Sequence, residues 1–97
     1  MVYKNKLHID STCIQTENIL SSNIDDEVVM MSMDTDKYYG LDPIGSRIWK
    51  LLQEPCTLRQ VCEKLVLEFQ VDASTCQHDV LEFIQKLADA QLVMPVD

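Results

Sequence analysis

The sequence of 97 residues predicts an α+β fold in which a three-stranded antiparallel sheet is followed by three helices. Three observations support this fold class. Short apolar runs separated by turn residues fill the first half, the spacing of apolar residues becomes helical near residue 42, and later segments begin with helix-capping motifs. The length allows one modest core. We therefore expect one domain at residues 12–97, preceded by a flexible N-terminus at residues 1–11.

The first half predicts three short strands. CIQTEN, at residues 13–18, alternates weakly and indicates the first strand, whereas residues 19–26 indicate a connection because they hold serines, Asn23 and two adjacent aspartates. VVMMSM and KYYGL are extended in character and are separated by the turn sequence DTD, so residues 27–41 predict a hairpin. Three strands in sequence order would form a small meander.

The first helix is expected at residues 43–53. Asp42 is a good N-cap, and Pro43 suits the first helical position because its missing N–H would have no helical partner there. Ile44, Ile48 and Leu51 then recur at helical spacing. Pro55 prevents the helix from continuing.

Two further helices complete the predicted fold. Thr57 and Gln60 form a capping-box pattern before the second helix, which ends at VD, residues 71–72. The third helix is expected at residues 73–90, opening with Ser74 and Gln77 in the same pattern, and residues 92–96 should form a short extended tail. Short helices joined by tight turns and followed by a longer one resemble a winged helix-turn-helix with the strands placed first.

Charge and hydropathy restrict the classes of partner. Eight basic and 16 acidic side chains give a formal charge of −8, which repels phosphate backbones and argues against nucleic acid. The apolar runs are too short to cross a bilayer, and the N-terminus lacks the apolar core of a secretion signal. We therefore expect a cytoplasmic protein with no membrane partner.

Motifs for catalysis, metals or cofactors are missing from the sequence. It has no nucleophile elbow, phosphate-binding glycine loop or HExxH motif. The four cysteines have no CxxC spacing, which favours buried free thiols over a zinc site. Carboxylates at residues 25–27, Asp34 and Asp36 lack the spacing of an EF-hand, and turn capping explains them better than a calcium site. We expect no catalytic residue, no metal and no cofactor.

The last predicted strand and the third predicted helix indicate a binding surface. In a meander, residues 37–41 would be an edge strand with unpaired N–H and C=O groups. The third helix has a wide apolar stripe centred on Val80, Ile84 and Leu87, so one flank of it either faces a partner or is wrapped by a small core. A bare strand edge beside a helix with spare apolar surface is the geometry for β-augmentation, in which an extended peptide adds a strand.

Three segments carry a family resemblance: KYYGLDPIGSRIWKLL, EPCTLRQVCEKL and VDASTCQHDVLEFIQKLADAQLV. The specific features are Tyr39 and Leu41 at a strand end, Gly45, an Ile48-Trp49 pair, and the spacing of Asp79, Val80, Phe83, Ile84 and Leu87. Together these features, across residues 13–95, resemble the PqqD-like family of recognition elements for ribosomally synthesised and post-translationally modified peptides (RiPPs).

Within that family, Tyr38-Tyr39, Glu54-Pro55 and Cys76 are most similar to the stand-alone leader-binding proteins of lasso peptide clusters. The resemblance implies a winged-helix-like domain that binds the leader of a precursor peptide as an added strand, between the third strand and the third helix. It also implies presentation of the leader to a separate leader peptidase. Many relatives have an Asp-Gly turn where this chain has Glu54-Pro55-Cys56, which weakens assignment to the pyrroloquinoline-quinone branch.

The resemblance also implies which residues bind the peptide. The third strand would supply the pairing edge, and the third helix would supply an apolar pocket and its polar rim. The candidates are Lys37, Tyr38, Tyr39, Gly40 and Leu41 for the edge; Val80, Phe83, Ile84 and Leu87 for the pocket; and Asp79, Glu82 and Lys86 for the rim. Core packing explains Ile84 and Leu87 at least as well, and Tyr39 and Leu41 are expected to point into the core.

Two other functions fit parts of the pattern. A PqqD-like carrier could serve another modifying enzyme, such as a radical SAM enzyme, and a winged helix could bind DNA as a regulator. For DNA, the third helix should have clustered basic residues, whereas it has Lys86 among Asp79, Glu82 and Asp89. The sequence therefore favours a non-catalytic, leader-binding protein of lasso peptide maturation.

Overall fold

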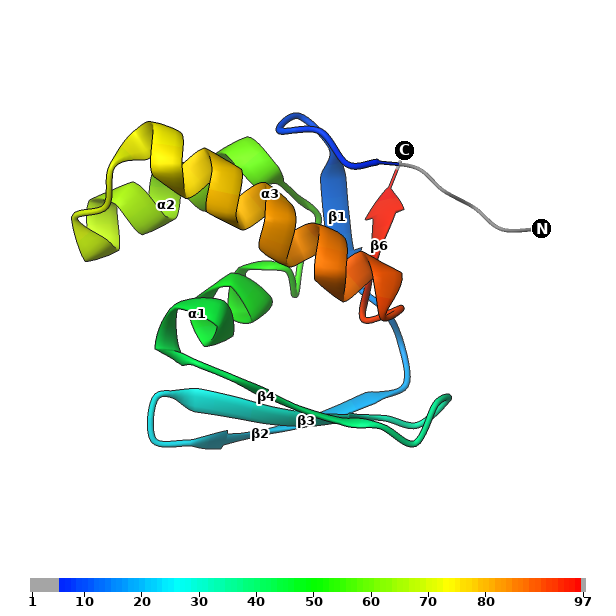
Figure 1. Cartoon of the computed structure of the whole chain (residues 1–97). Helices are drawn as coiled ribbons and strands as arrows, with labels where there is room; N and C mark the ends of the chain where they lie inside the picture. Colours follow the sequence, from blue (N-terminus) through cyan, green and yellow to red (C-terminus); the bar gives the residue numbers. More distant parts are fainter. Residues whose placement is uncertain (1–5, 97) are drawn as a thin grey trace.

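A computed structural model gives the structure of the chain and describes residues 6–96. Within this range the chain forms three helices and two three-stranded antiparallel sheets, shown in Figure 1. The helices are α1 (Pro43–Leu51), α2 (Leu58–Phe69) and α3 (Ala73–Asp89). No helix among the described residues is long and apolar enough to cross a membrane. The predicted α+β fold class is confirmed.

The two sheets differ in how far apart their strands lie in the sequence. One sheet has the order β5-β1-β6 and joins β1 (Thr12–Gln15), β5 (Cys56–Thr57) and β6 (Val93–Val96). The other has the order β2-β3-β4 and is a meander of β2 (Ile19–Ile24), β3 (Glu27–Ser32) and β4 (Tyr38–Leu41). The meander therefore exists, with β4 as its last strand.

The prediction of a connection at residues 19–26 was wrong, because β2 occupies most of that segment. A two-residue turn at Asp25 and Asp26 joins β2 to β3, and Ile24 is opposite Glu27. Asp25 has a φ of 57°, a left-handed conformation that aspartate tolerates in tight hairpin turns. The serines of β2 are compatible with a strand because this strand lies at an exposed edge.

The prediction that the first strand belongs to the meander was also wrong. β1 pairs with β6 and β5, so Cys13 is opposite both Pro95 and Cys56. Asn18 has a φ of 65° and lies between β1 and β2, where the chain leaves one sheet for the other. These partners are distant in sequence, so the local pattern of residues 13–18 contained no signal for them.

Helix capping agrees with the sequence at two of the three helices. The Asp42 carboxylate accepts the Gly45 N–H at 2.7 Å, and Thr57 forms the predicted capping box with Gln60. At α3 the predicted cap was wrong: Asp72, not Ser74, is the N-cap, and its carboxylate accepts the Thr75 N–H at 3.0 Å. The helix begins at Ala73, so Ser74 is already inside its first turn.

The N-terminal segment packs against α2 and α3. Residues 1–5 lie outside the described part of the chain, and the flexibility of residues 1–11 stays a prediction. Leu7 is buried, and its N–H donates to Gln85 Oε1 at 2.9 Å. The Arg59 guanidinium donates to both carboxylate oxygens of Asp10, at 2.9 and 3.3 Å.

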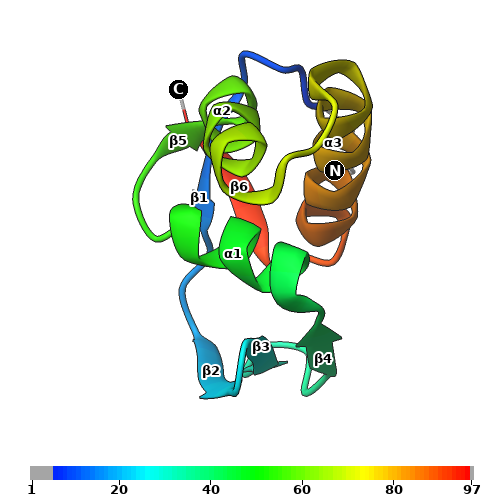
Figure 2. The same ribbon diagram turned by 90° about the vertical axis from the view of Figure 1, so that its left-hand side faces the viewer.

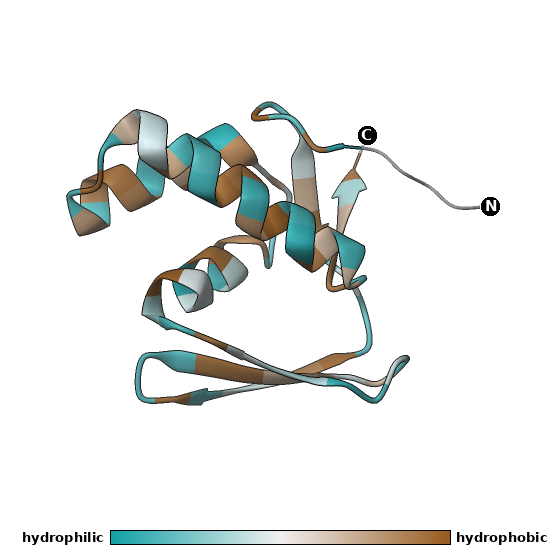
Figure 3. Ribbon diagram, in the orientation of Figure 1, coloured by the Kyte–Doolittle hydropathy of each residue, from teal (hydrophilic) through white to brown (hydrophobic). Residues whose placement is uncertain are grey.

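The core lies around α1, which is placed between the β2–β3–β4 sheet and the pair α2 and α3, as Figures 1 and 2 show. Ile48 and Trp49 of α1 are buried, as are Val28 and Met30 of β3. Figure 3 shows hydrophobic segments in the strands of this sheet as well as in all three helices. Buried side chains of α1 and β3 therefore belong to one core, which connects the β2–β3–β4 sheet to the helices.

Ser46 connects α1 to this sheet by hydrogen bonds. Its hydroxyl accepts the Val28 N–H at 2.8 Å and donates to the Leu41 carbonyl at 3.1 Å. Val28 and Leu41 are opposite each other in β3 and β4, so the buried hydroxyl closes the end of the strand ladder. The Ser46 Oγ atom thereby links α1 to both β3 and β4.

Two cysteines of the core face each other across α2 and α3. Cys62 and Cys76 are both buried free thiols. Burial, and secondarily the neighbouring Cys76, raises the pKa of Cys62 to about 12. The thiol is therefore protonated at neutral pH, and a protonated thiol is a poor nucleophile.

We predict that Ser46→Ala lowers the free energy of unfolding by about 1–3 kcal/mol, the usual cost of leaving buried polar groups unpaired. Val28 N–H and Leu41 C=O would both lose a partner. Ser22→Ala, at an exposed position of β2, should change stability by less than about 0.5 kcal/mol. Urea denaturation measures both variants, and equal effects would contradict the role of Ser46.

We also predict that Cys62 makes the fold sensitive to alkaline pH. Between its ordinary pKa of 9.0 and its folded value of about 12, the unfolded chain releases this proton and the folded chain keeps it. Stability is therefore complete below pH 9 and falls as the pH rises, by up to about 1.4 kcal/mol per pH unit. Urea denaturation at pH 8, 9.5 and 10.5 should show a shallower fall for Cys62→Ala, and parallel curves would refute the prediction.

Candidate functional site

The free edge of β4 is the first part of the candidate site. Among residues 6–96, β4 pairs only with β3. Ser32 N–H donates to the Lys37 carbonyl at 2.9 Å, so these two residues form a hydrogen-bonded pair of the β3–β4 ladder. Hydrogen-bonded pairs alternate with non-hydrogen-bonded pairs in antiparallel strands, and Tyr39 is therefore the next residue that bonds to β3. Tyr38 and Gly40 direct their N–H and C=O groups away from β3. The edge therefore offers the main-chain donors and acceptors of Tyr38 and Gly40.

A cleft of about 390 Å³ lies beside the C-terminal end of this strand. It is bounded by the end of β4, the start of α1, the end of α2 and the first half of α3. Its wall is largely apolar, with a few polar groups among the lining residues. The principal apolar residues are Ile44, Ile48, Leu65, Phe69, Val80 and Phe83, and the polar ones are Asp42, Thr75 and Asp79.

Gly45 allows the wall formed by Phe83 to approach α1. A Cβ atom at position 45 would lie 3.0 Å from Phe83 Cζ and 3.1 Å from Asp42 Oδ1. Such distances are tighter than ordinary van der Waals contact, so a larger residue would push the ring outward. The small residue at position 45 thus sets where the Phe83 ring stands in the cleft.

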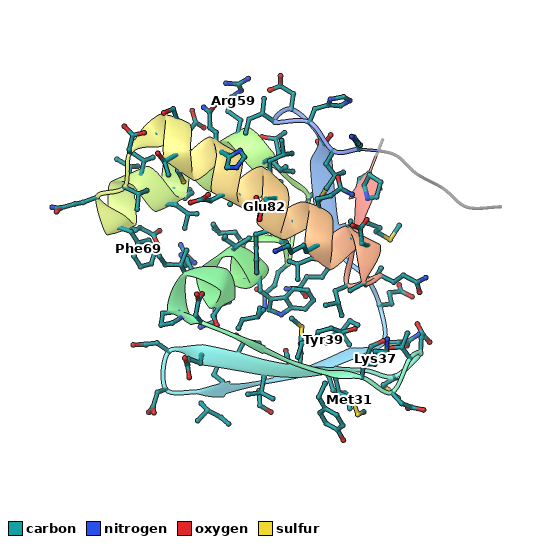
Figure 4. The ribbon with its side chains drawn as sticks, in the orientation of Figure 1. Met31, Lys37, Tyr39, Arg59, Phe69 and Glu82 are labelled. Atoms are coloured by element: carbon teal, nitrogen blue, oxygen red, sulfur yellow. The ribbon has the colours of Figure 1, made fainter. Side chains whose placement is uncertain are left out.

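An ion pair holds the opposite wall in place. The Arg47 guanidinium donates to both carboxylate oxygens of Glu68, at 2.8 and 2.9 Å, and so ties α1 to the end of α2. These hydrogen bonds keep the pKa of the Glu68 carboxyl below its ordinary value. Phe69, the next residue, lies at the end of α2 and is labelled in Figure 4. The ion pair therefore positions one aromatic wall of the cleft.

The charged groups that line the cleft are acidic. Asp42 and Asp79 are both exposed at its border, and the lining includes no lysine or arginine. The Asp42 carboxylate already accepts the Gly45 N–H, which leaves Asp79 as the freer acceptor. An extended ligand with apolar side chains and N–H or cationic groups matches this lining.

The structure brings five of the predicted site residues to the cleft. Gly40 and Leu41 come from β4, and Asp79, Val80 and Phe83 come from α3. Strand and helix are therefore adjacent, as the β-augmentation geometry requires, and Figure 2 shows α3 above the β4 side of the sheet.

The other predicted residues lie elsewhere, and their role as peptide contacts stays a prediction. Ile84 and Leu87 are buried in the core. Tyr38, the first residue of β4, is exposed, as is Lys37 just before the strand. Tyr39 packs against the core, and Figure 4 shows it on the helix side of the sheet. Glu82 and Lys86 are exposed on α3, where the Lys86 ammonium is 3.6 Å from a Glu82 carboxylate oxygen.

Sequence reasoning missed the wall contributed by α2 and the α2–α3 turn. Phe69 and Val71 line the cleft opposite Phe83. The available signal was an aromatic residue at the end of the second helix's apolar face, followed by a break and another apolar residue. That signal is weak because an apolar face does not indicate whether its last residue reaches the core or an opening in the surface.

Metal binding has no support from the described residues. Between residues 6 and 96 no group of three or more His, Cys, Asp or Glu residues could hold a metal ion. The arrangement instead offers main-chain hydrogen bonds and an apolar cleft, which are means of binding a chain in extended form.

Comparison with known proteins gives one family and two solved structures. Residues 27–93 match the family described as coenzyme PQQ synthesis protein D (PqqD). The structure of TbiB1 in complex with the TbiA(β) leader peptide is similar at 34% identity, covering 87% of this chain and 98% of that chain, with a TM-score of 0.80.

A second solved structure, lasso peptide synthetase B1 complexed with the leader peptide, has 17% identity and a TM-score of 0.75. It covers 86% of this chain and 98% of that chain, and at this identity it shows a common fold. No curated protein sequence matches the chain significantly.

Proposed function

The chain belongs to the PqqD family, and on this premise we propose that it binds the leader region of a ribosomally made precursor peptide as an added β-strand. We further propose that it delivers the leader to a separate leader peptidase in lasso peptide maturation. The observation that carries the proposal is the free edge of β4 beside an apolar cleft. This combination provides both parts of a strand-addition site.

The main chain of β4 would provide affinity. A guest strand would exchange hydrogen bonds with Tyr38 and Gly40, whose N–H and C=O groups point away from β3. Such bonds require an extended backbone but place little demand on side-chain identity. Residues of β4 that bond to β3 would be unaffected.

The cleft would provide specificity. Alternate side chains of a guest strand point to the same face, so those on the helix side would reach the apolar wall between Phe83 and Phe69. The acidic Asp79 at the border favours a leader with an N–H donor or a basic group nearby. We expect apolar anchors in the leader at spacings of two residues.

The solved relative supports this assignment. TbiB1 holds the TbiA(β) leader peptide and is 34% identical to this chain over most of its length. We propose that the present chain likewise binds its ligand without altering any covalent bond. The bond-breaking step then belongs to the peptidase.

We predict that Gly40→Pro abolishes the main-chain pairing. Proline removes the N–H that points to the free edge, while the ladder to β3 does not use it. Losing one bond and blocking the strand should weaken leader binding at least tenfold, corresponding to about 1.4 kcal/mol. Fluorescence anisotropy with a labelled synthetic leader from the accompanying precursor peptide measures the affinity.

Gly40→Ala is the matched control for this variant. It keeps the N–H, and a Cβ atom at this position meets nothing within 4 Å. Its leader affinity should stay within about twofold of the wild type, a much smaller change than the tenfold loss, about 1.4 kcal/mol, expected for Gly40→Pro. Equal affinities for both variants would rule out edge pairing, and wild-type binding to the core peptide but not to the leader would overturn the proposed function.

We also predict that Phe83→Ala weakens leader binding by about 1–3 kcal/mol, because it removes an aromatic wall of the cleft. Leu67→Ala is the control, since Leu67 is 82% exposed on α2 and does not line the cleft. Isothermal titration calorimetry on both folded variants decides the question. Full affinity of Phe83→Ala would exclude Phe83 from the site.

A further inference from the structure

The face of the β2–β3–β4 sheet that points away from the helices carries exposed apolar side chains from all three strands. Leu20, Met31 and Tyr38 form one row, because Leu20 is opposite Met31 and Met31 is opposite Tyr38. In the next row, Val29 lies between Ser22 of β2 and Gly40 of β4. We call this surface, consisting of these residues and Ile24, the outer face.

The outer face is unusually exposed for its composition. Tyr38 is 75% exposed, Ile24 60% and Leu20 56%. In Figure 4, Met31 lies on the side of the sheet away from the helices, whereas Tyr39 lies on the side toward them. A sheet with one face on the core normally presents polar side chains on the other. A row of exposed hydrophobic residues on that second face is typical of a contact surface.

The rim of the outer face is acidic at both ends. The turn between β2 and β3 and the start of β3 carry Asp25, Asp26 and Glu27, and the turn between β3 and β4 carries Asp34 and Asp36; all five are exposed. Residues 19–41 contain a single basic residue, Lys37. The complementary surface is therefore apolar at its centre and basic around it.

Charge also argues against a second copy of the chain as the occupant. Two outer faces packed together would bring two sets of acidic turns into one interface, with one lysine from each copy to offset them. A different protein with a basic rim is the better complement.

The outer face is continuous with the proposed leader site. Tyr38 contributes its side chain to the outer face and its main chain to the free edge of β4. A leader strand added to this edge would extend the same sheet. A protein seated on the outer face would therefore lie directly beside the bound leader, where an enzyme that cleaves the precursor has to come.

We propose that the outer face is the docking surface for the leader peptidase, through a peptidase surface that is apolar at its centre and basic at its rim. The inference rests on the proposed function, and it adds the surface through which the second partner is bound. The leader occupies the edge and the cleft, and the peptidase occupies the opposite face of the same sheet.

The test uses a purified leader peptidase from the same organism, and the chain loaded with its leader. Leu20→Lys places a charge at the centre of the outer face and should weaken peptidase binding at least tenfold in biolayer interferometry. Leu67→Lys makes the same change at a more exposed position on α2, 82% against 56% for Leu20, and should leave that affinity unchanged. Both variants should bind the leader as the wild type does, which also verifies that they are folded.

A second variant, Ile24→Lys, gives an independent reading should Leu20→Lys unfold, because Ile24 is 60% exposed at the other end of β2. It too should weaken peptidase binding while preserving leader binding. Raising the NaCl concentration from about 50 to about 300 mM should weaken the complex of the wild-type chain with the peptidase, because salt screens the charges of the acidic rim. A salt-insensitive complex would overturn the basic-rim assignment.

The remaining outcomes separate the two proposals. Normal leader binding with equal peptidase affinity for the wild type, Leu20→Lys and Ile24→Lys would overturn the docking surface and leave leader binding intact. The proposed docking surface would also be overturned if the wild-type chain, loaded with its leader, failed to bind the peptidase. If sedimentation showed that the wild type forms a dimer and that Leu20→Lys abolishes it, the outer face would bind a second copy of the chain instead of the peptidase. Absence of leader binding by the wild type would remove the proposed function itself.

Discussion

The buried hydroxyl of Ser46 is the interaction on which the geometry of the molecule depends. It joins the Val28 N–H of β3 to the Leu41 carbonyl of β4, and it belongs to α1. Asp42 alone separates β4 from α1, so the strand cannot move without moving the helix. Because α1 also packs against α2 and α3, this junction sets the distance between the free strand edge and the cleft beside it.

A single four-residue strand serves three surfaces because its main chain and its two faces point in different directions. Tyr39 and Leu41 pack toward the core, while Tyr38 and Gly40 present their main chain to the free edge. The side chain of Tyr38 belongs to the outer face. An exposed edge beside apolar residues invites aggregation, and the acidic turns at both ends of the sheet oppose it by repulsion between copies.

Most of the local structure could be predicted from the sequence, because caps and apolar spacing act over a few residues. Asp42 and Thr57 cap helices as expected, and β3 and β4 form the expected hairpin with β4 at the edge. Half of the candidate site followed from this, namely the strand edge and the part of α3 that faces it. The wall from α2 did not, because Phe69 reaches the cleft only where the end of α2 meets α1, beside the Arg47–Glu68 ion pair.

The sequence by itself determined where α1 and α2 begin, which strand ends the meander, and that the chain carries a formal net charge of −8. Only the tertiary structure decided that β1 pairs with β5 and β6, and that residues 19–24 form a strand. It also decided that Phe83 lines the cleft while its neighbour Ile84 is buried in the core. The physical reason is that an apolar pattern records which side of an element avoids water, whereas the neighbour that covers that side comes from a distant part of the chain.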